Sequence, residues 1–173
     1  MLGLACVAAA WLYTGGPRPY GYAGYGELFV FIFFGLAATV GTTYVVNESI
    51  GLLAWYSGAV SGCLSVALLM VNNIRDIDGD LRSGKRTLAV RLGPARSKGL
   101  FVVVYVVAGV LIIASSTQSL GALLGLVGLL AALPAIATVR ESTEAKDLVR
   151  ALGMTARVQM VVGALFAVGL IVR

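Results

Sequence analysis

The sequence contains no histidine, and charged residues make up only 12% of its 173 positions. Without histidine the chain lacks the commonest general base and the commonest zinc ligand, so any catalysis or metal binding must use other side chains. Soluble domains carry charge at roughly a quarter of their positions. A chain with so few charges and a mean hydropathy of +0.93 lacks the polar surface that a folded core needs in water, which excludes a soluble globular protein.

Cysteine is scarce as well. Cys6 and Cys63 both lie in apolar runs and do not have the spacing of a metal site. We expect them to act as small hydrophobic residues inside helices. No basic segment precedes the apolar stretch that starts at Met1, so a cleaved signal peptide is not predicted.

The chain contains three long runs without any charged residue. Residues 28–46 and 49–71 are uncharged over 19 and 23 positions. Each run can cross a hydrocarbon core of about 30 Å as a helix that rises about 1.5 Å per residue. Residues 99–139 are uncharged over 41 positions, and the polar cluster at 115–119 divides them into a hairpin of two helices.

Two further helices complete the prediction, a last one at about 155–172 and a first one at 1–13 that is short for a full span. Backbone groups in lipid must be paired within the segment, and these lengths fit helices rather than barrel strands. The sequence therefore predicts an all-α, polytopic membrane bundle of about six transmembrane helices in a single domain, 1–173.

The basic residues gather in alternate connections. Residues 13–27 carry one, 72–98 carry seven and 140–157 carry four, whereas the connections near 47–48 and 115–119 carry none. The positive-inside rule places the basic connections in the cytoplasm and both chain ends on the outer side. An outer start without basic residues suggests that further helices precede residue 1. This placement explains the net charge of +5 without a nucleic-acid partner.

Residues 72–87 combine paired carboxylates with basic residues. If the preceding helix continues for one more turn, Asp76 and Asp80 lie on one face, four positions apart. Two like charges repel there, and a divalent cation would offset the repulsion. Mg²⁺ prefers oxygen ligands and takes one or two carboxylates together with substrate phosphates. Basic side chains that suit a diphosphate stand close by: Arg75, Arg82, Lys85 and Arg86.

Other interpretations of this segment compete with a metal site. A solvated loop of mixed charge that only sets membrane orientation accounts for the charges equally well. A calcium loop of the EF-hand type fits poorly, because Leu81 and Thr87 stand where glycine and glutamate are required.

Two stretches of this sequence resemble motifs of the UbiA-type membrane prenyltransferases. NNIRDIDGD at 72–80, followed by GKRTLAVRLG at 84–93, is similar to the second aspartate-rich motif of that family. YTGGPRPYGY at 13–22, which runs on to Gly26 and Glu27, resembles the loop between the fourth and fifth helices of the branch that prenylates 1,4-dihydroxy-2-naphthoate in menaquinone synthesis. The order and spacing of the two motifs extend the resemblance over essentially the whole chain.

The resemblance implies a nine-helix fold, of which the present helices would be the fourth to the ninth, in a bacterial plasma membrane with cytoplasmic active-site loops. It implies Mg²⁺-dependent transfer of a polyprenyl group from polyprenyl diphosphate to dihydroxynaphthoate, with loss of the carboxylate. Two aspartate-rich motifs would hold the metal and the diphosphate. The first, of the form Asn-Asp-x-x-Asp, does not occur in this chain, which would therefore supply half of the metal site.

Carried onto this sequence, the resemblance makes Asp76 and Asp80 the metal ligands and catalytic residues, while Asp78 projects off their face. Asn73 would complete the metal shell or bind a phosphate. The diphosphate would be bound by Arg18, Arg75, Lys85, Arg86 and Asn73. A prenyltransferase with another aromatic acceptor and a non-catalytic membrane scaffold remain as alternatives.

Two other groups of residues have more than one possible role. The tyrosines Tyr13, Tyr20 and Tyr22 line the reaction site or, as we favour, form an interfacial aromatic belt. Four glycines suit close helix packing: Gly35, Gly41, Gly58 and Gly62.

Overall fold

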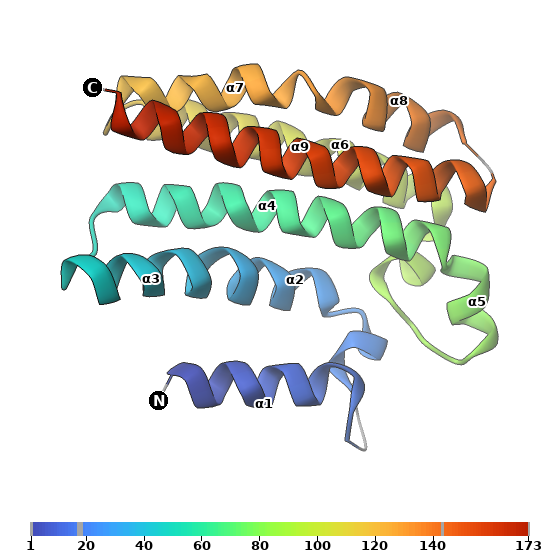
Figure 1. The fold of residues 1–173 in the computed structure, drawn as a ribbon. Coiled ribbons are helices and arrows are strands. Elements are labelled where there is room, and N and C mark those ends of the chain that lie inside the picture. Colours follow the sequence, from blue (N-terminus) through green and yellow to red (C-terminus); the bar gives the residue numbers. More distant parts are fainter. Residues whose placement is uncertain (1, 17–18, 143, 173) are drawn as a thin grey trace.

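The computed structural model describes residues 2–16, 19–142 and 144–172, which are almost entirely helical and contain no strand. The long helices run side by side as a bundle (Figure 1). In chain order the elements are α1 (Leu2–Thr14), η1 (Tyr20–Ala23), α2 (Gly26–Val30), η2 (Phe31–Ala37), α3 (Ala38–Asn47), α4 (Leu52–Arg75), α5 (Ile77–Arg82), α6 (Leu88–Ser115), η3 (Leu120–Leu123), α7 (Leu124–Leu129), α8 (Ala132–Glu141) and α9 (Ala145–Ile171).

Five helical stretches of the described chain are long and apolar enough to cross a membrane: Gly26–Asn47, Leu52–Arg75, Leu88–Ser115, Leu120–Glu141 and Ala145–Ile171. α1, with 13 residues, is shorter than these. The prediction of an all-α polytopic membrane protein with one abbreviated helix is therefore confirmed. The turn predicted at 115–119 also forms, between α6 and η3.

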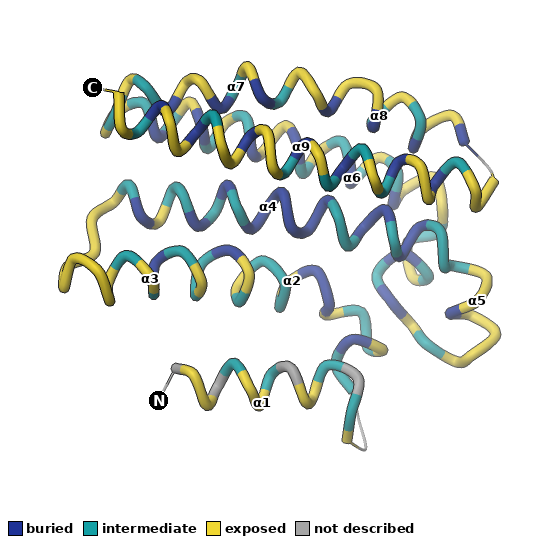
Figure 2. Tube along the Cα trace, viewed as in Figure 1, coloured by how far each residue is buried: buried dark blue, intermediate teal, exposed yellow. Residues whose placement is uncertain are grey.

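α4 is the central helix of the bundle. It packs against η2, α6 and α9, and Figure 2 shows the longest buried stretch of the chain along it. Fully buried residues of α4 such as Ala67 and Val71 meet Phe101 of α6 and Val158 of α9 in the main hydrophobic cluster. Burial on several sides fixes the position of α4, and with it the position of the polar residues at its end.

Close backbone contacts join several helices. A Cβ on Gly35, in the π-helical segment η2, would lie 2.6 Å from the carbonyl oxygen of Gly58 in α4 and even closer to Gly62. At the opposite edge of the bundle, a Cβ on Gly121 or on Gly169 would overlap the backbone oxygen of the other. The predicted close packing is confirmed for Gly35, Gly58 and Gly62, and small residues allow it because helix backbones can then touch.

The helix boundaries near the charged residues differ from the prediction. The basic stretch at 72–98, expected as a loop, contains α5 and the first part of α6. α9 begins at Ala145 rather than near residue 155. Charge marks where a helix leaves the lipid, not where it ends, because charged side chains are good helix formers in water. The actual break within α6 lies at Gly93, which has φ 76° and precedes Pro94.

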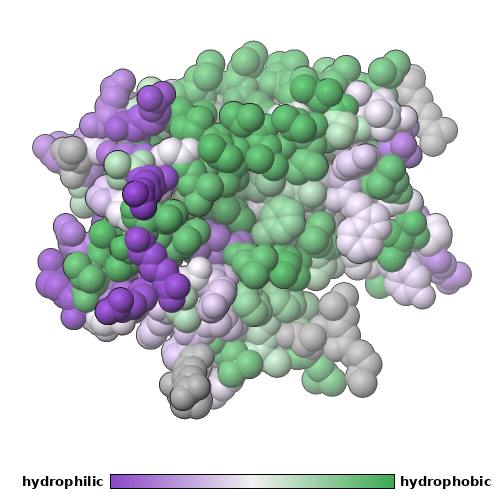
Figure 3. Space-filling model, turned by 180° about the vertical axis from the view of Figure 1, so that it is seen from behind, coloured by the Kyte–Doolittle hydropathy of each residue, from purple (hydrophilic) through white to green (hydrophobic). Residues whose placement is uncertain are grey.

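Hydrophilic residues gather at one end of the molecule, while its sides are apolar (Figure 3). That end carries α5, the start of α6 and the connection from α8 to α9 (Figure 1). The sides expose many large apolar residues, including Val106, Leu133 and Met160. This distribution is that of an integral membrane protein with one strongly charged end.

Candidate active site at the charged end of the bundle

α4 and α5 follow each other almost without interruption, with a bend at Asp76 between them. Backbone hydrogen bonds continue across the bend, from Asp76 N to the Asn72 carbonyl at 3.1 Å and from Asp80 N to the Asp76 carbonyl at 2.8 Å. Asp76 itself departs from helical geometry, with φ −95° and ψ 4°. The predicted spacing of one turn between Asp76 and Asp80 is kept, although α4 does not continue unbroken.

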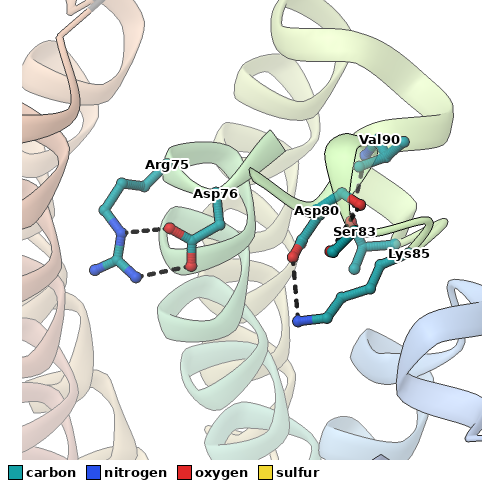
Figure 4. A network of polar contacts seen from close by, with 7 residues as sticks. Arg75, Asp76, Asp80, Ser83, Lys85 and Val90 are labelled. Atoms are coloured by element: carbon teal, nitrogen blue, oxygen red, sulfur yellow. Dashed lines mark hydrogen bonds and ion pairs between the residues drawn. The ribbon is translucent and has the colours of Figure 1, made fainter. Parts of the chain in front are cut away.

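Each of these two carboxylates has its own cationic partner (Figure 4). Arg75 donates two hydrogen bonds to Asp76, from Nε to Oδ1 at 2.7 Å and from its terminal nitrogen to Oδ2 at 2.8 Å. Lys85 Nζ lies 3.3 Å from Asp80 Oδ1, and Asp80 is only 8% exposed. Asp78 is exposed and makes no ion pair with any described residue.

The segment after α5 docks on η1. Lys85 Nζ lies 4.8 Å from the centre of the Tyr22 ring, within the range of a cation–π contact. Arg86 N donates to the Tyr22 carbonyl at 2.8 Å, and Arg91 Nε donates to the Arg86 carbonyl at 3.1 Å. Gly24 adopts φ 83° beside this contact. The two stretches with family-like motifs therefore meet in space.

A second polar contact joins the same two regions below the surface. Asn73 Nδ2 on α4 donates to Glu27 Oε1 on α2 at 3.0 Å, and the two residues are 9% and 8% exposed. Glu27 Oε2 is buried and has no hydrogen-bond partner among the described residues. Sequence reasoning assigned Glu27 no role. The available signal was a lone acidic residue directly before an uncharged run of membrane length, which is a candidate functional residue by default.

Aromatic side chains pack beside this region. Tyr20 stacks on Phe29 with ring centres 3.8 Å apart, meets Tyr13 edge-on at 5.5 Å and donates from its hydroxyl to the Ala9 carbonyl at 2.7 Å. Burial and the neighbouring Tyr13 raise the pKa of Tyr20, so its hydroxyl stays protonated and donates. Tyr13 and Tyr20 therefore form a packed cluster with Phe29, and their place in an interfacial belt stays a prediction.

An apolar groove of about 740 Å³ runs between α2, α4 and α9. Its polar lining residues are Asn72, Ser65 and Gln159, and Gln159 Nε2 donates to Ser65 Oγ at 3.2 Å. Asn72 directly precedes Asn73 in the chain. The groove therefore begins beside the charged cluster, the ion pairs of Asp76 with Arg75 and of Asp80 with Lys85. It continues along the membrane-spanning part of the bundle.

The structure joins the predicted site residues in separate pairs at the end of α4 and in the segment after it: Arg75 with Asp76, Lys85 with Asp80, and Asn73 with Glu27. Arg86 is exposed, and its backbone N–H donates to the Tyr22 carbonyl. Arg18 lies outside the described residues. No group of three His, Cys, Asp or Glu side chains that could enclose a metal occurs in the described ranges.

Comparison with known proteins gives relatives over the whole chain. The UbiA prenyltransferase family model matches residues 1–170. The proteins named 1,4-dihydroxy-2-naphthoate octaprenyltransferase from Mycobacterium tuberculosis and Mycobacterium leprae are 42% and 41% identical over 97% and 98% of this chain. The protein of that name from Haemophilus influenzae is 44% identical over 56% of this chain and 32% of its own length.

This chain spans 57% of the length of each mycobacterial relative. No solved structure matches it. A family model that covers nearly every residue agrees with the two motifs, which meet at the charged end of an apolar helical bundle. The chain belongs to the UbiA prenyltransferase family.

Proposed function

We propose that the protein containing this chain transfers a polyprenyl group from polyprenyl diphosphate to 1,4-dihydroxy-2-naphthoate in menaquinone synthesis. The allylic carbon–oxygen bond breaks and its electron pair leaves with the diphosphate. A new carbon–carbon bond forms on the aromatic ring, and the ring carboxylate departs as carbon dioxide. The names of the mycobacterial relatives support this choice of acceptor.

The observation that carries the proposal is the pairing of two carboxylates with two cations at the end of an apolar bundle. Asp76 with Arg75, and Asp80 with Lys85, offer both signs of charge in one place. A phosphate ester with its metal needs both signs, whereas a loop that only sets orientation needs basic residues alone. The pairing therefore favours a diphosphate site over a purely topological role.

The donor set suits Mg²⁺. Asp76 and Asp80 supply two carboxylates one helical turn apart, and Mg²⁺ commonly takes one or two carboxylates and completes its shell with phosphate oxygens and water. A full protein cage is not required for such an ion. When bound, the metal would act as a Lewis acid toward the leaving diphosphate.

The side chains of this chain would bind and orient the diphosphate. Arg75 and Lys85 lie within reach of the carboxylates and become available to phosphate oxygens once the carboxylates have another cation. Arg86 and Arg18 are proposed as further diphosphate contacts. The groove of about 740 Å³ has the apolar lining that a prenyl chain requires, and its dry walls would keep water from the allylic cation.

We further propose that the charged end faces the cytoplasm of a bacterial cell. In the described ranges the Lys and Arg residues lie between Arg75 and Lys98 and between Arg140 and Arg157. Arg157 lies midway along α9, the others lie nearer the charged end, and the opposite connections contain none. The positive-inside rule then fixes the orientation in the plasma membrane. The acceptor and the diphosphate would both arrive from the cytoplasmic side.

The proposal is tested with the product of the complete reading frame that contains this chain, purified into lipid nanodiscs. Geranylgeranyl diphosphate, Mg²⁺ and 1,4-dihydroxy-2-naphthoate are supplied, and the products are identified by mass spectrometry. The expected product is prenylated and has lost the mass of carbon dioxide. A folded protein that prenylates only 4-hydroxybenzoate would support a different acceptor, and one that prenylates neither would support a non-catalytic role.

A further inference from the structure

Glu27 occupies an unusual position for a carboxylate. It is 8% exposed and stands at the start of a candidate membrane span, Gly26–Asn47. Burial of a carboxylate is costly unless a partner compensates it. Its one hydrogen-bond partner among the described side chains is Asn73 Nδ2, at 3.0 Å, and Oε2 has none. Among the described residues this buried carboxylate therefore accepts one side-chain hydrogen bond, from Asn73, which lies about one turn before Asp76.

The contact fixes which end of the Asn73 amide is free. A carboxylate oxygen accepts hydrogen bonds, so the amide group must present its nitrogen to Glu27. The side-chain oxygen of Asn73, Oδ1, then points away from Glu27. It receives no hydrogen bond from the described residues, and it is not one of their fully buried unpaired atoms. That oxygen consequently borders accessible space.

The winding of α4 and α5 relates this oxygen to the two carboxylates. Asn73, Asp76 and Asp80 follow each other at three and four positions, and backbone hydrogen bonds run through the bend between the helices. The backbone hydrogen bonds keep a spacing of about one turn between successive members of this series across the bend at Asp76. An amide oxygen and two carboxylates make a set of hard oxygen donors suited to a divalent cation.

We infer that Glu27 is a positioning residue, which holds the Asn73 amide so that its carbonyl oxygen serves as a third protein ligand of the divalent cation beside Asp76 and Asp80. The inference rests on the Mg²⁺-dependent function proposed above. It assigns the side-chain oxygen of Asn73 to the metal, because the hydrogen bond to Glu27 turns the amide nitrogen toward Glu27 and leaves Oδ1 without a donor among the described residues.

Direct binding of Mn²⁺, in the absence of any prenyl substrate, tests the inference. The full-length protein is titrated in detergent, and free Mn²⁺ is read from its electron paramagnetic resonance signal. Glu27→Ala is expected to weaken Mn²⁺ binding about ten- to a hundredfold, as loss of a group that orients a metal ligand typically does. The double variant with Asn73→Ala should bind no more weakly than Asn73→Ala alone, because Glu27 acts only through Asn73. Additive losses would overturn the inference.

An exchanged pair keeps the test decisive if Glu27→Ala does not fold. In the double variant Glu27→Gln with Asn73→Asp, the new amide donates and the new carboxylate accepts, which leaves one carboxylate oxygen for the metal. This variant should bind Mn²⁺ at least as tightly as the original protein, because the hydrogen bond is kept and a carboxylate oxygen replaces the amide oxygen at the metal. Binding more than about threefold weaker, with unfolding temperature unchanged, would overturn the inference.

Glu48→Ala is the matched control for Glu27→Ala, because Glu48 is an exposed glutamate just beyond the opposite end of the same span. Its Mn²⁺ affinity should equal that of the original protein. An equal loss at Glu48 would mean that the effect at Glu27 reports general electrostatics and would overturn the inference. Mn²⁺ binding needs no turnover, so the binding results stand or fall separately from the prenyl-transfer assay.

Discussion

The residues of the charged cluster are arranged so that each acid neutralises a neighbouring base. Asp76 and Arg75 are adjacent in sequence, and Asp80 and Lys85 are joined across the turn after α5 (Figure 4). A metal diphosphate would replace both contacts at once, since its cation suits the carboxylates and its oxygens suit Arg75 and Lys85. We therefore expect metal and diphosphate to bind more tightly together than separately.

The first residue-scale prediction concerns the carboxylates. Asp76→Asn or Asp80→Asn should lower prenyl transfer by about a hundredfold or more, because each removes a charge beside the leaving group while keeping the side-chain shape. Asp78→Asn should have little effect, since Asp78 is exposed and unpaired with any described residue. Initial rates at saturating Mg²⁺ provide the measurement. Comparable losses at Asp78 and Asp76 would contradict the assignment.

A second prediction concerns Lys85. Lys85→Gln should weaken the apparent affinity for prenyl diphosphate about ten- to a hundredfold, because a hydrogen bond to a charged group contributes about 1.5–3 kcal/mol. Arg96→Gln is the control, since Arg96 is exposed and makes no ion pair with the described residues. Equal behaviour of the two variants would indicate that both residues serve orientation alone. Arg91 is unsuited as a control, because it holds the Arg86 carbonyl.

Among the elements, the membrane spans were the most predictable. Uncharged runs of sufficient length located four of the five long helices, and the polar residues at 115–119 located the turn between two of them. α5 and the starts of α6 and α9 were not predicted, because we interpreted the charged stretches as loops. Local turn residues, Gly84 and the pair Gly93–Pro94, mark the breaks more accurately than charge does.

The candidate site was only partly predictable, for a different reason. The motif at 72–87 indicated which residues lie close along the chain, including Asp76 and Asp80. The contact between Asn73 and Glu27 spans 46 positions, and that of Arg86 with Tyr22 spans two long helices. Such contacts depend on how α2 packs on α4, which a periodic pattern in one sequence does not specify.

The contact between Gly121 and Gly169 gives an element-scale prediction. Gly169→Ala should lower the free energy of unfolding by about 1–3 kcal/mol, because its new methyl group would overlap the Gly121 carbonyl and force η3 and α9 apart. Gly163→Ala on the same helix meets nothing within 4 Å and should cause no loss. Thermal unfolding in detergent compares the two. Equal stability of both variants would show that the helices separate without cost.

On the scale of the whole molecule, the asymmetry of charge predicts how it sits in the membrane. Single cysteines introduced at Lys85 and Lys146 should react with an impermeant maleimide only from the cytoplasmic side, and one at Ser116 only from the outer side, in a background with Cys6 and Cys63 replaced. The structure places the first two at one end and Ser116 at the other. Labelling of Lys85 and Ser116 positions from the same side would exclude this orientation.

The two acid–base pairs also govern how the molecule responds to ionic strength. With Arg75 opposite Asp76 and Lys85 opposite Asp80, the four side chains sum to no net charge before anything binds. A metal diphosphate is itself close to neutral, so binding exchanges partners within the cluster and barely alters the field outside it. Salt screens interactions between separated net charges most strongly. The contribution of these four side chains to substrate affinity should therefore change little between dilute and concentrated buffers, and the salt dependence that is measured should come from the proposed contacts of Arg18 and Arg86.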